Sequence, residues 1–175
     1  MKLYCDTDTL LHNIQRHGDQ NDVRREMEGL EELLQRRRTG TLTIYRSRVV
    51  LRELERTADE DQRARLRADY ESLEQIPQDE RVLGFNNVID LHGCSSCYPL
   101  VSDVQDEAIC SELQAHGIDL GDAQHITQAV CNNCDVFLTR DEGTIISQRA
   151  WIEERFPGLK VRRPSELLDE LALTD

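Results

Sequence analysis

Short apolar runs alternate along this chain with longer amphipathic stretches. Residues 2–6, 41–45 and 135–139 are rich in apolar, β-branched and aromatic side chains, the composition of β-strands. Between residues 22 and 38 the apolar positions follow at steps of four, three, three and one, which places them on one helical face. Further helices are expected at about 47–75, 102–116, 121–131 and 146–156 and from Pro164, with a short strand at 159–162.

This alternation predicts an α/β protein, a three-layer α/β/α sandwich around a short, mainly parallel central sheet. A chain of 175 residues is long enough to bury one core, so we expect a single domain over residues 1–175. Residues 76–101 contain two prolines and two glycines and are expected to form an irregular, cysteine-containing insertion.

The charges of the chain bear on whether it binds nucleic acids. The chain has 34 acidic and 21 basic residues, a net charge of −13, which argues against a general nucleic-acid binder because phosphate contacts need cations. The basic residues are clustered, at Arg36–Arg38, at Arg46, Arg48 and Arg52, and at Arg162–Arg163. No apolar run is long enough to cross a membrane, and an acid follows too soon after Met1 for a signal peptide, so the cytoplasm is the expected location.

Four acids occupy matching positions relative to the expected strands. Asp6 ends the first strand and Asp141 follows the strand at 135–139, whereas Glu53 and Asp122 lie near the starts of helices. Because the carboxyl ends of parallel strands meet at one edge of a sheet, all four can face one crevice. Carboxylates gathered in this way favour a hard cation such as Mg²⁺ or Mn²⁺, which activates water against a phosphodiester.

Residues 1–11, 47–54, 121–129 and 136–141 each contain one of these acids, and together they resemble the four motifs of the PIN-domain ribonuclease family, in the family's order. The resemblance covers most of the chain. It implies a PIN-like fold and a metal-dependent endoribonuclease. Asp6, Glu53, Asp122 and Asp141 would then bind one or two Mg²⁺ or Mn²⁺ ions, with Thr7 and Thr139 as polar supports.

Many members of that family are toxins of toxin–antitoxin pairs of the VapC type, often dimeric, so the resemblance also implies RNA as substrate, an antitoxin partner and a homodimer. The chain departs from the family pattern at two places. Asp8 stands where the family commonly has Asn, and the segment at 76–101 is extra. The extra segment places the toxin assignment in question more than the fold.

The cysteines suggest a second metal site. Cys94 and Cys97 form one C-x-x-C pair, and Cys131 and Cys134 form another, the spacing of a structural Zn²⁺ site. If the helices at 103–116 and 121–131 pack antiparallel, the two pairs can meet at the end of that helical hairpin. The alternative is four ordinary small thiols in the core. The other two cysteines, Cys5 and Cys110, are expected in the core, and His92 and His125 are minor candidates for ligand or substrate contacts.

Two other functions remain open. Asp6 and Asp8 also resemble the paired aspartates of haloacid-dehalogenase phosphatases, as nucleophile and acid–base, with Thr139 and Lys160 as the further motif residues. That reading leaves Glu53 and Asp122 without a role. The third hypothesis is a non-catalytic, zinc-braced PIN-like scaffold that binds a partner.

Overall fold

The central element of this computed structural model is a five-stranded sheet. It is formed by β1 (Lys2–Cys5), β2 (Thr43–Arg46), β3 (Glu74–Gln75), β6 (Val136–Leu138) and β7 (Lys160–Arg162), in the order β3-β2-β1-β6-β7. Every neighbouring pair in this sheet is parallel. The structure describes residues 1–10, 20–89, 92 and 94–173, without the side chains of residues 8, 10 and 20.

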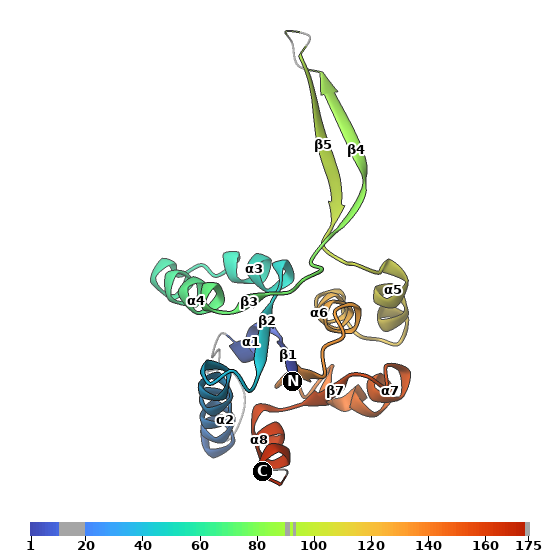
Figure 1. The fold of residues 1–175 in the computed structure, drawn as a ribbon. Helices are drawn as coiled ribbons and strands as arrows, with labels where there is room; N and C mark the ends of the chain where they lie inside the picture. The colour runs from blue at the N-terminus through green and yellow to red at the C-terminus, as the bar shows by residue number, and fades with distance from the viewer. Residues whose placement is uncertain (11–19, 90–91, 93, 174–175) are drawn as a thin grey trace.

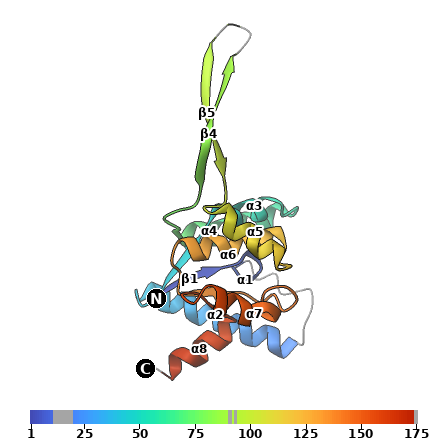
Figure 2. The same ribbon diagram turned by 90° about the vertical axis from the view of Figure 1, so that its right-hand side faces the viewer.

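Helices cover both faces of this sheet. They are α1 (Thr7–Leu10), α2 (Gln20–Arg38), α3 (Arg48–Glu55), α4 (Glu60–Ser72), α5 (Glu107–Ala115), α6 (Leu120–Cys131), the 3-10 helix η1 (Ile146–Gln148), α7 (Arg149–Arg155) and α8 (Pro164–Ala172). Figure 2 shows α3 to α6 on one side of the sheet and α2, α7 and α8 on the other. The predicted α/β class and three-layer arrangement are confirmed. None of the described helices has both the length and the apolar character needed to cross a membrane.

The core is centred on the middle strand β1. Leu3, Tyr4 and Cys5 are fully buried, as are Phe137 and Leu138 in the neighbouring strand β6. A strand covered by helices on both faces has no solvent side, which explains why its sequence is a continuous apolar run. The Tyr4 ring stacks on Phe137 with 5.6 Å between centroids, so the two strands that end at the acids are fixed to each other by packing.

The prediction of an irregular segment at 76–101 was wrong. The structure has there a long antiparallel hairpin of β4 (Arg81–Ile89) and β5 (Ser95–Ser102), which projects from the helical layer of α3 to α6 (Figure 1). The glycine and proline that suggested a loop are compatible with this hairpin. Gly84 lies where the register shifts, as at a β-bulge, and Pro99 lies in a strand that has an open edge.

Helix α5 also begins later than the sequence indicated, at Glu107 rather than near Ser102. Ser102 is still the last residue of β5. The side chain of Asp106 accepts hydrogen bonds from the backbone N–H groups of Ala108 and Ile109, at 2.9 and 3.2 Å, and so sets the helix start.

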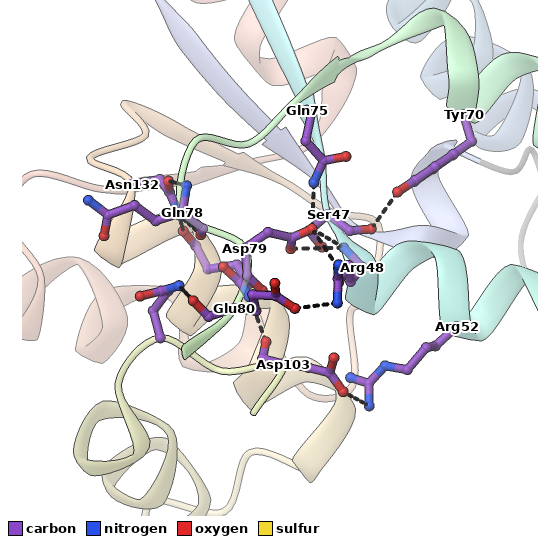
Figure 3. Close-up of polar contacts among 12 residues, drawn as sticks. Ser47, Arg48, Arg52, Tyr70, Gln75, Gln78, Asp79, Glu80, Asp103 and Asn132 are labelled. Atoms are coloured by element: carbon purple, nitrogen blue, oxygen red, sulfur yellow. Dashed lines mark hydrogen bonds and ion pairs between the residues drawn. The ribbon is translucent and has the colours of Figure 1, made fainter. Parts of the chain in front are cut away.

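Polar contacts at the base of the hairpin tie it to the helices (Figure 3). Asp79 accepts hydrogen bonds from the Arg48 backbone N–H, at 2.9 and 3.0 Å, and from the side chain of Gln75. Gln78 and Asn132 exchange two hydrogen bonds of 2.8 Å. These contacts lie before β4 and fix the direction in which the hairpin leaves the body.

On the opposite side of the sheet, a buried acid joins α2 to α8. Glu26 is only 4% exposed and accepts hydrogen bonds from the backbone N–H and the hydroxyl of Ser165, at 3.0 and 2.5 Å. Gly29 allows the close approach of these helices, since a Cβ there would lie 2.9 Å from the Ser165 nitrogen. Glu26 therefore satisfies N–H groups at the start of α8 from a neighbouring helix.

We expect Glu26→Ala to lower the free energy of unfolding by about 2 kcal/mol or more, because it leaves buried donors at Ser165 without an acceptor. Glu28→Ala is the matched control, since Glu28 lies on the same helix in a solvent-exposed pair with Arg24. That control should change stability by less than about 0.5 kcal/mol. Urea unfolding followed by circular dichroism measures both, and equal effects would contradict the role given to Glu26.

Candidate functional site

The first acid of the site lies at the C-terminal end of β1. The Asp6 backbone N–H donates to the Leu138 carbonyl at 3.1 Å, so Asp6 continues the ladder between β1 and β6. Its carboxylate accepts one hydrogen bond from the Thr9 backbone N–H, at 2.7 Å, and another from the Thr139 hydroxyl. Burial raises the pKa of Asp6, although these hydrogen bonds act in the opposite direction. The side chain is thus held in one orientation at the edge of the sheet.

Asp141 reaches the same edge from β6. Thr139 connects the two acids, because its hydroxyl also accepts a hydrogen bond from the Asp141 backbone N–H at 3.0 Å. The Asp141 carboxylate accepts from the Thr144 backbone N–H at 2.9 Å, which orders the turn after the strand. Thr139 is fully buried and contacts both acids, in agreement with a supporting position.

Glu53 is held by a buried hydrogen-bonded chain that the sequence did not reveal. Its carboxylate lies 3.0 Å from Nε2 of His125, which is 2% exposed. The other ring nitrogen lies 2.8 Å from the Tyr4 hydroxyl, which in turn lies 2.6 Å from the Ser47 hydroxyl. The Thr7 hydroxyl also approaches Nε2 of His125, at 3.3 Å. Burial raises the pKa of Glu53, but the hydrogen bond and charge of His125, together with Thr7 and Arg56, lower it further, so the net shift is downward and favours the carboxylate.

Asp122 is the acid of the site whose pKa is raised by its neighbours. Burial raises its pKa to about 8, together with the negative charges of Asp119, Asp141, Asp6 and Glu53. Its Oδ2 atom is buried and has no hydrogen-bond partner among the residues that the structure describes. The other three acids predicted from the sequence are therefore near enough to affect the ionisation of Asp122.

Asp119 is a fifth acid, which sequence reasoning did not single out. Its carboxylate accepts a hydrogen bond of 3.0 Å from the Asp122 backbone N–H and caps α6. After burial, its charge is the largest contribution to the raised pKa of Asp122. The signal in the sequence was an aspartate three residues before another at a helix start, which resembles an ordinary cap.

The donor chemistry of the site fits a hard divalent cation. Carboxylate oxygens are the preferred protein ligands of Mg²⁺ and Mn²⁺, and the buried Asp122 Oδ2 atom lacks a partner. However, the described residues contain no group of three or more His, Cys, Asp or Glu side chains arranged to hold a metal ion. The acids therefore lie near one another, whereas the described residues do not form a preorganised coordination site.

The four cysteines do not meet. Cys97 lies in β5 of the projecting hairpin and Cys94 just before it, both exposed, whereas Cys131 and Cys134 lie at the end of α6 in the body. Burial raises the pKa of Cys131 to about 11 and that of Cys134 to about 12, which keeps both as thiols. The predicted shared zinc site is not formed, because Cys97 in β5 and Cys94 just before it lie on the hairpin, which projects away from α6 (Figure 1). Cys5 and Cys110 are buried, as expected.

The arrangement does not favour the phosphatase hypothesis. Lys160 opens β7 and is in register with Val136, the first residue of β6, so it lies at the edge of the sheet opposite Asp6. Its ammonium group lies 3.9 Å from Glu170. Asp6 is engaged by two hydrogen-bond donors, and the side chain of Asp8 lies outside the described residues.

Most of the predicted basic clusters are paired with acids. Arg48 pairs with Asp79 and Glu80, Arg52 with Asp103, Arg36 with Glu32, Arg162 with Glu153 and Glu170, and Arg163 with Glu142. These cations therefore neutralise the protein's own acids in this structure. These paired arginines do not form a basic surface for phosphate binding.

The raised pKa of Asp122 predicts a falling stability with rising pH. Between about pH 4 and pH 8 the folded protein retains a proton that the unfolded chain releases, so the free energy of unfolding declines across that window. We expect Asp122→Asn to flatten this decline, and to be more heat-stable than the wild type at about pH 9 in EDTA. Thermal melts at about pH 5 and pH 9 test this, and parallel pH profiles for the two proteins would exclude it.

Comparison with known proteins identifies no family. No family model matches the chain, and no curated protein matches it. Among solved structures, the chain is similar to the crystal structure of VapBC2 from Rickettsia felis bound to a DNA fragment from their promoter. The two are 16% identical, the alignment covers 93% of this chain and 98% of that chain, and the TM-score is 0.46.

Proposed function

We propose that this protein is a metal-dependent endoribonuclease that hydrolyses RNA phosphodiester bonds, with Asp6, Glu53, Asp122 and Asp141 as the ligands of Mg²⁺ or Mn²⁺. The observation that carries the proposal is the gathering of carboxylates at one edge of the sheet, where Thr139 joins Asp6 to Asp141 and the buried Oδ2 atom of Asp122 has no hydrogen-bond partner in the described part of the chain. The pKa of Asp122, raised by burial and by the nearby charges of the other three acids and Asp119, supports it. A fold gains no stability by gathering like charges, so such a cluster is typical of a functional site. The motif order of the PIN-domain family supports the same assignment.

The acids and their hydrogen-bond partners would have distinct roles in this reaction. A bound divalent cation would supply an activated water and would offset negative charge on the phosphodiester. Thr139 and the Thr9 backbone N–H orient Asp6, and His125 orients Glu53 and keeps it ionised. Asp122 would give up its proton when a cation offsets the neighbouring charges, so metal binding is expected to release protons.

A toxin role with an antitoxin partner is the finer form of this proposal. It rests on the resemblance of the four motifs to the VapC type. A small neighbouring gene that encodes a DNA-binding protein would favour that role. The scaffold alternative keeps the same fold without turnover.

The test is cleavage of a labelled RNA pool with Mg²⁺ or Mn²⁺. We expect Asp6→Asn and Asp122→Asn each to reduce the rate roughly a hundredfold or more, because metal assistance is worth several kcal/mol. Asp135→Asn is the control, since this exposed acid lies at the opposite end of β6, where it accepts from the Lys2 backbone N–H. Activity that survives both site substitutions would overturn the assignment, and a folded but inactive wild type would favour the scaffold.

A second prediction concerns His125. His125→Ala removes the group that lowers the pKa of Glu53, so we expect the Mg²⁺ concentration for half-maximal cleavage to rise roughly tenfold to a hundredfold. His116→Ala is the control, because the ring of His116 stacks on Trp151 and takes no part in the hydrogen-bonded chain of Glu53, His125 and Tyr4. A loss of maximal rate with an unchanged Mg²⁺ requirement would show that His125 does not act through Glu53.

A further inference from the structure

The hairpin of β4 and β5 has one strongly apolar face. Residues directly opposite in an antiparallel pair share a face, and faces alternate along each strand. The pairs Val82–Val101, Phe85–Pro99, Asn87–Cys97 and Ile89–Ser95 therefore lie on one side. We name this side the apolar face. The other side has the pairs Arg81–Ser102, Gly84–Leu100, Asn86–Tyr98 and Val88–Ser96. It has fewer apolar residues, although Val88, Tyr98 and Leu100 are exposed there.

The large side chains of the apolar face are open to solvent. Val82 is 53% exposed, Phe85 68%, Ile89 71% and Val101 43%. Figure 1 shows the hairpin standing clear of the body, so no other described element covers this face. A two-stranded hairpin alone is marginally stable in water, and it gains stability when an apolar face is packed. The exposure of so many large side chains on one arm is typical of an interaction site.

The chemistry of the face narrows the class of partner. It contains no Asp, Glu, Lys, Arg or His, and Arg81 at the base is the single charged residue in the two strands. A phosphate backbone or a charged peptide would find no complementary group there. Toward the tip, the polar residues Asn86, Asn87, Ser95 and Ser96 alternate with the apolar Val88 and Ile89, whereas an element that enters lipid would be apolar throughout. The partner must therefore present an uncharged apolar surface.

A second copy of this chain presents such a surface. The apolar face has no charge to repel its own image, as a two-fold interface requires. Its exposed aromatic and aliphatic side chains span the length of the hairpin, so two copies would meet along a long, narrow surface. Two sheets packed in this way lie about 10 Å apart, with their side chains interdigitated.

The geometry of the molecule favours contact through the arm. Each chain has a net charge of −13, which opposes direct contact between two bodies. An arm whose longer strand has nine residues extends about 30 Å, several times the screening length of about 8 Å at physiological salt. Arms that cross with their bodies at opposite ends would join two copies while the acidic bodies stay apart.

We propose that the apolar face of the hairpin binds the same face of a second copy, giving a two-fold dimer joined through its arms. The base of the arm is suited to this, because the contacts of Asp79 and the Gln78–Asn132 pair fix it to α3 and α6 (Figure 3). The proposal concerns the hairpin alone and is independent of the proposed nuclease activity.

The test is sedimentation equilibrium of the full chain over a range of concentrations. We expect a concentration-dependent dimer whose dissociation constant rises roughly tenfold to a hundredfold for Phe85→Ser or Ile89→Ser, as expected for the loss of one buried apolar side chain. Val88→Ser and Leu100→Ser are matched controls, because they make a similar change on the other side of the same strands. These controls should stay close to the wild type, and circular dichroism should show all four variants folded.

Three results would overturn the proposal. A wild type that is monomeric throughout the range would exclude self-association. A dimer that is weakened equally by variants on both faces, or by neither, would place the interface elsewhere. A monomer that instead binds vesicles of neutral phospholipid would show that the hairpin meets a membrane rather than a second copy.

Discussion

The hydrogen bond from the Thr139 hydroxyl to the Asp6 carboxylate is the contact on which the site depends. It joins the C-terminal ends of two neighbouring parallel strands, and these ends lie together only because β1 and β6 are in register at Cys5 and Leu138. The stacked rings of Tyr4 and Phe137 hold that register from within the core. Asp141 follows from the same contact, since the Thr139 hydroxyl also accepts from its backbone N–H.

In this arrangement, ionisation of the gathered acids lowers the stability of the fold. The sheet brings carboxylates to one edge, and the protein offsets only part of the resulting repulsion. Asp6 accepts two hydrogen bonds, and Glu53 is hydrogen-bonded to His125. Asp122, in contrast, has a buried oxygen without a partner in the described part of the chain. The pKa of Asp122 is raised first by burial and then by repulsion from the neighbouring acids. Under the proposed function, a divalent cation would offset that repulsion.

The sequence was informative where a residue's position depends on strand order alone. Asp6 and Asp141 follow apolar runs, so their common edge follows from a parallel sheet. The contact of His125 with Tyr4 could not be predicted from the sequence, because it depends on the rotation of α6 about its axis relative to β1. Asp119 looked like an ordinary helix cap and is one, but its charge also acts on Asp122. The hairpin was missed because Gly84 and Pro99 are typical of loops, and that error also produced the expected zinc site, since it left Cys94 and Cys97 free to fold back toward α6.

The same two helices, α3 and α6, hold two of the acids and the base of the hairpin. Glu53 lies on α3 beside Arg52, which forms an ion pair with Asp103 at 2.5 Å just after β5. Asp122 and His125 lie on α6, about two turns and about one turn before Gln128. The Gln128 side chain donates to the backbone carbonyls of Asp79 and Asp103 at 3.0 and 2.6 Å. Any partner that bends the hairpin therefore acts on the helices that position the acids. A dimer through the arms would also set the distance between two acidic edges, because the arms are fixed to the elements that carry those edges.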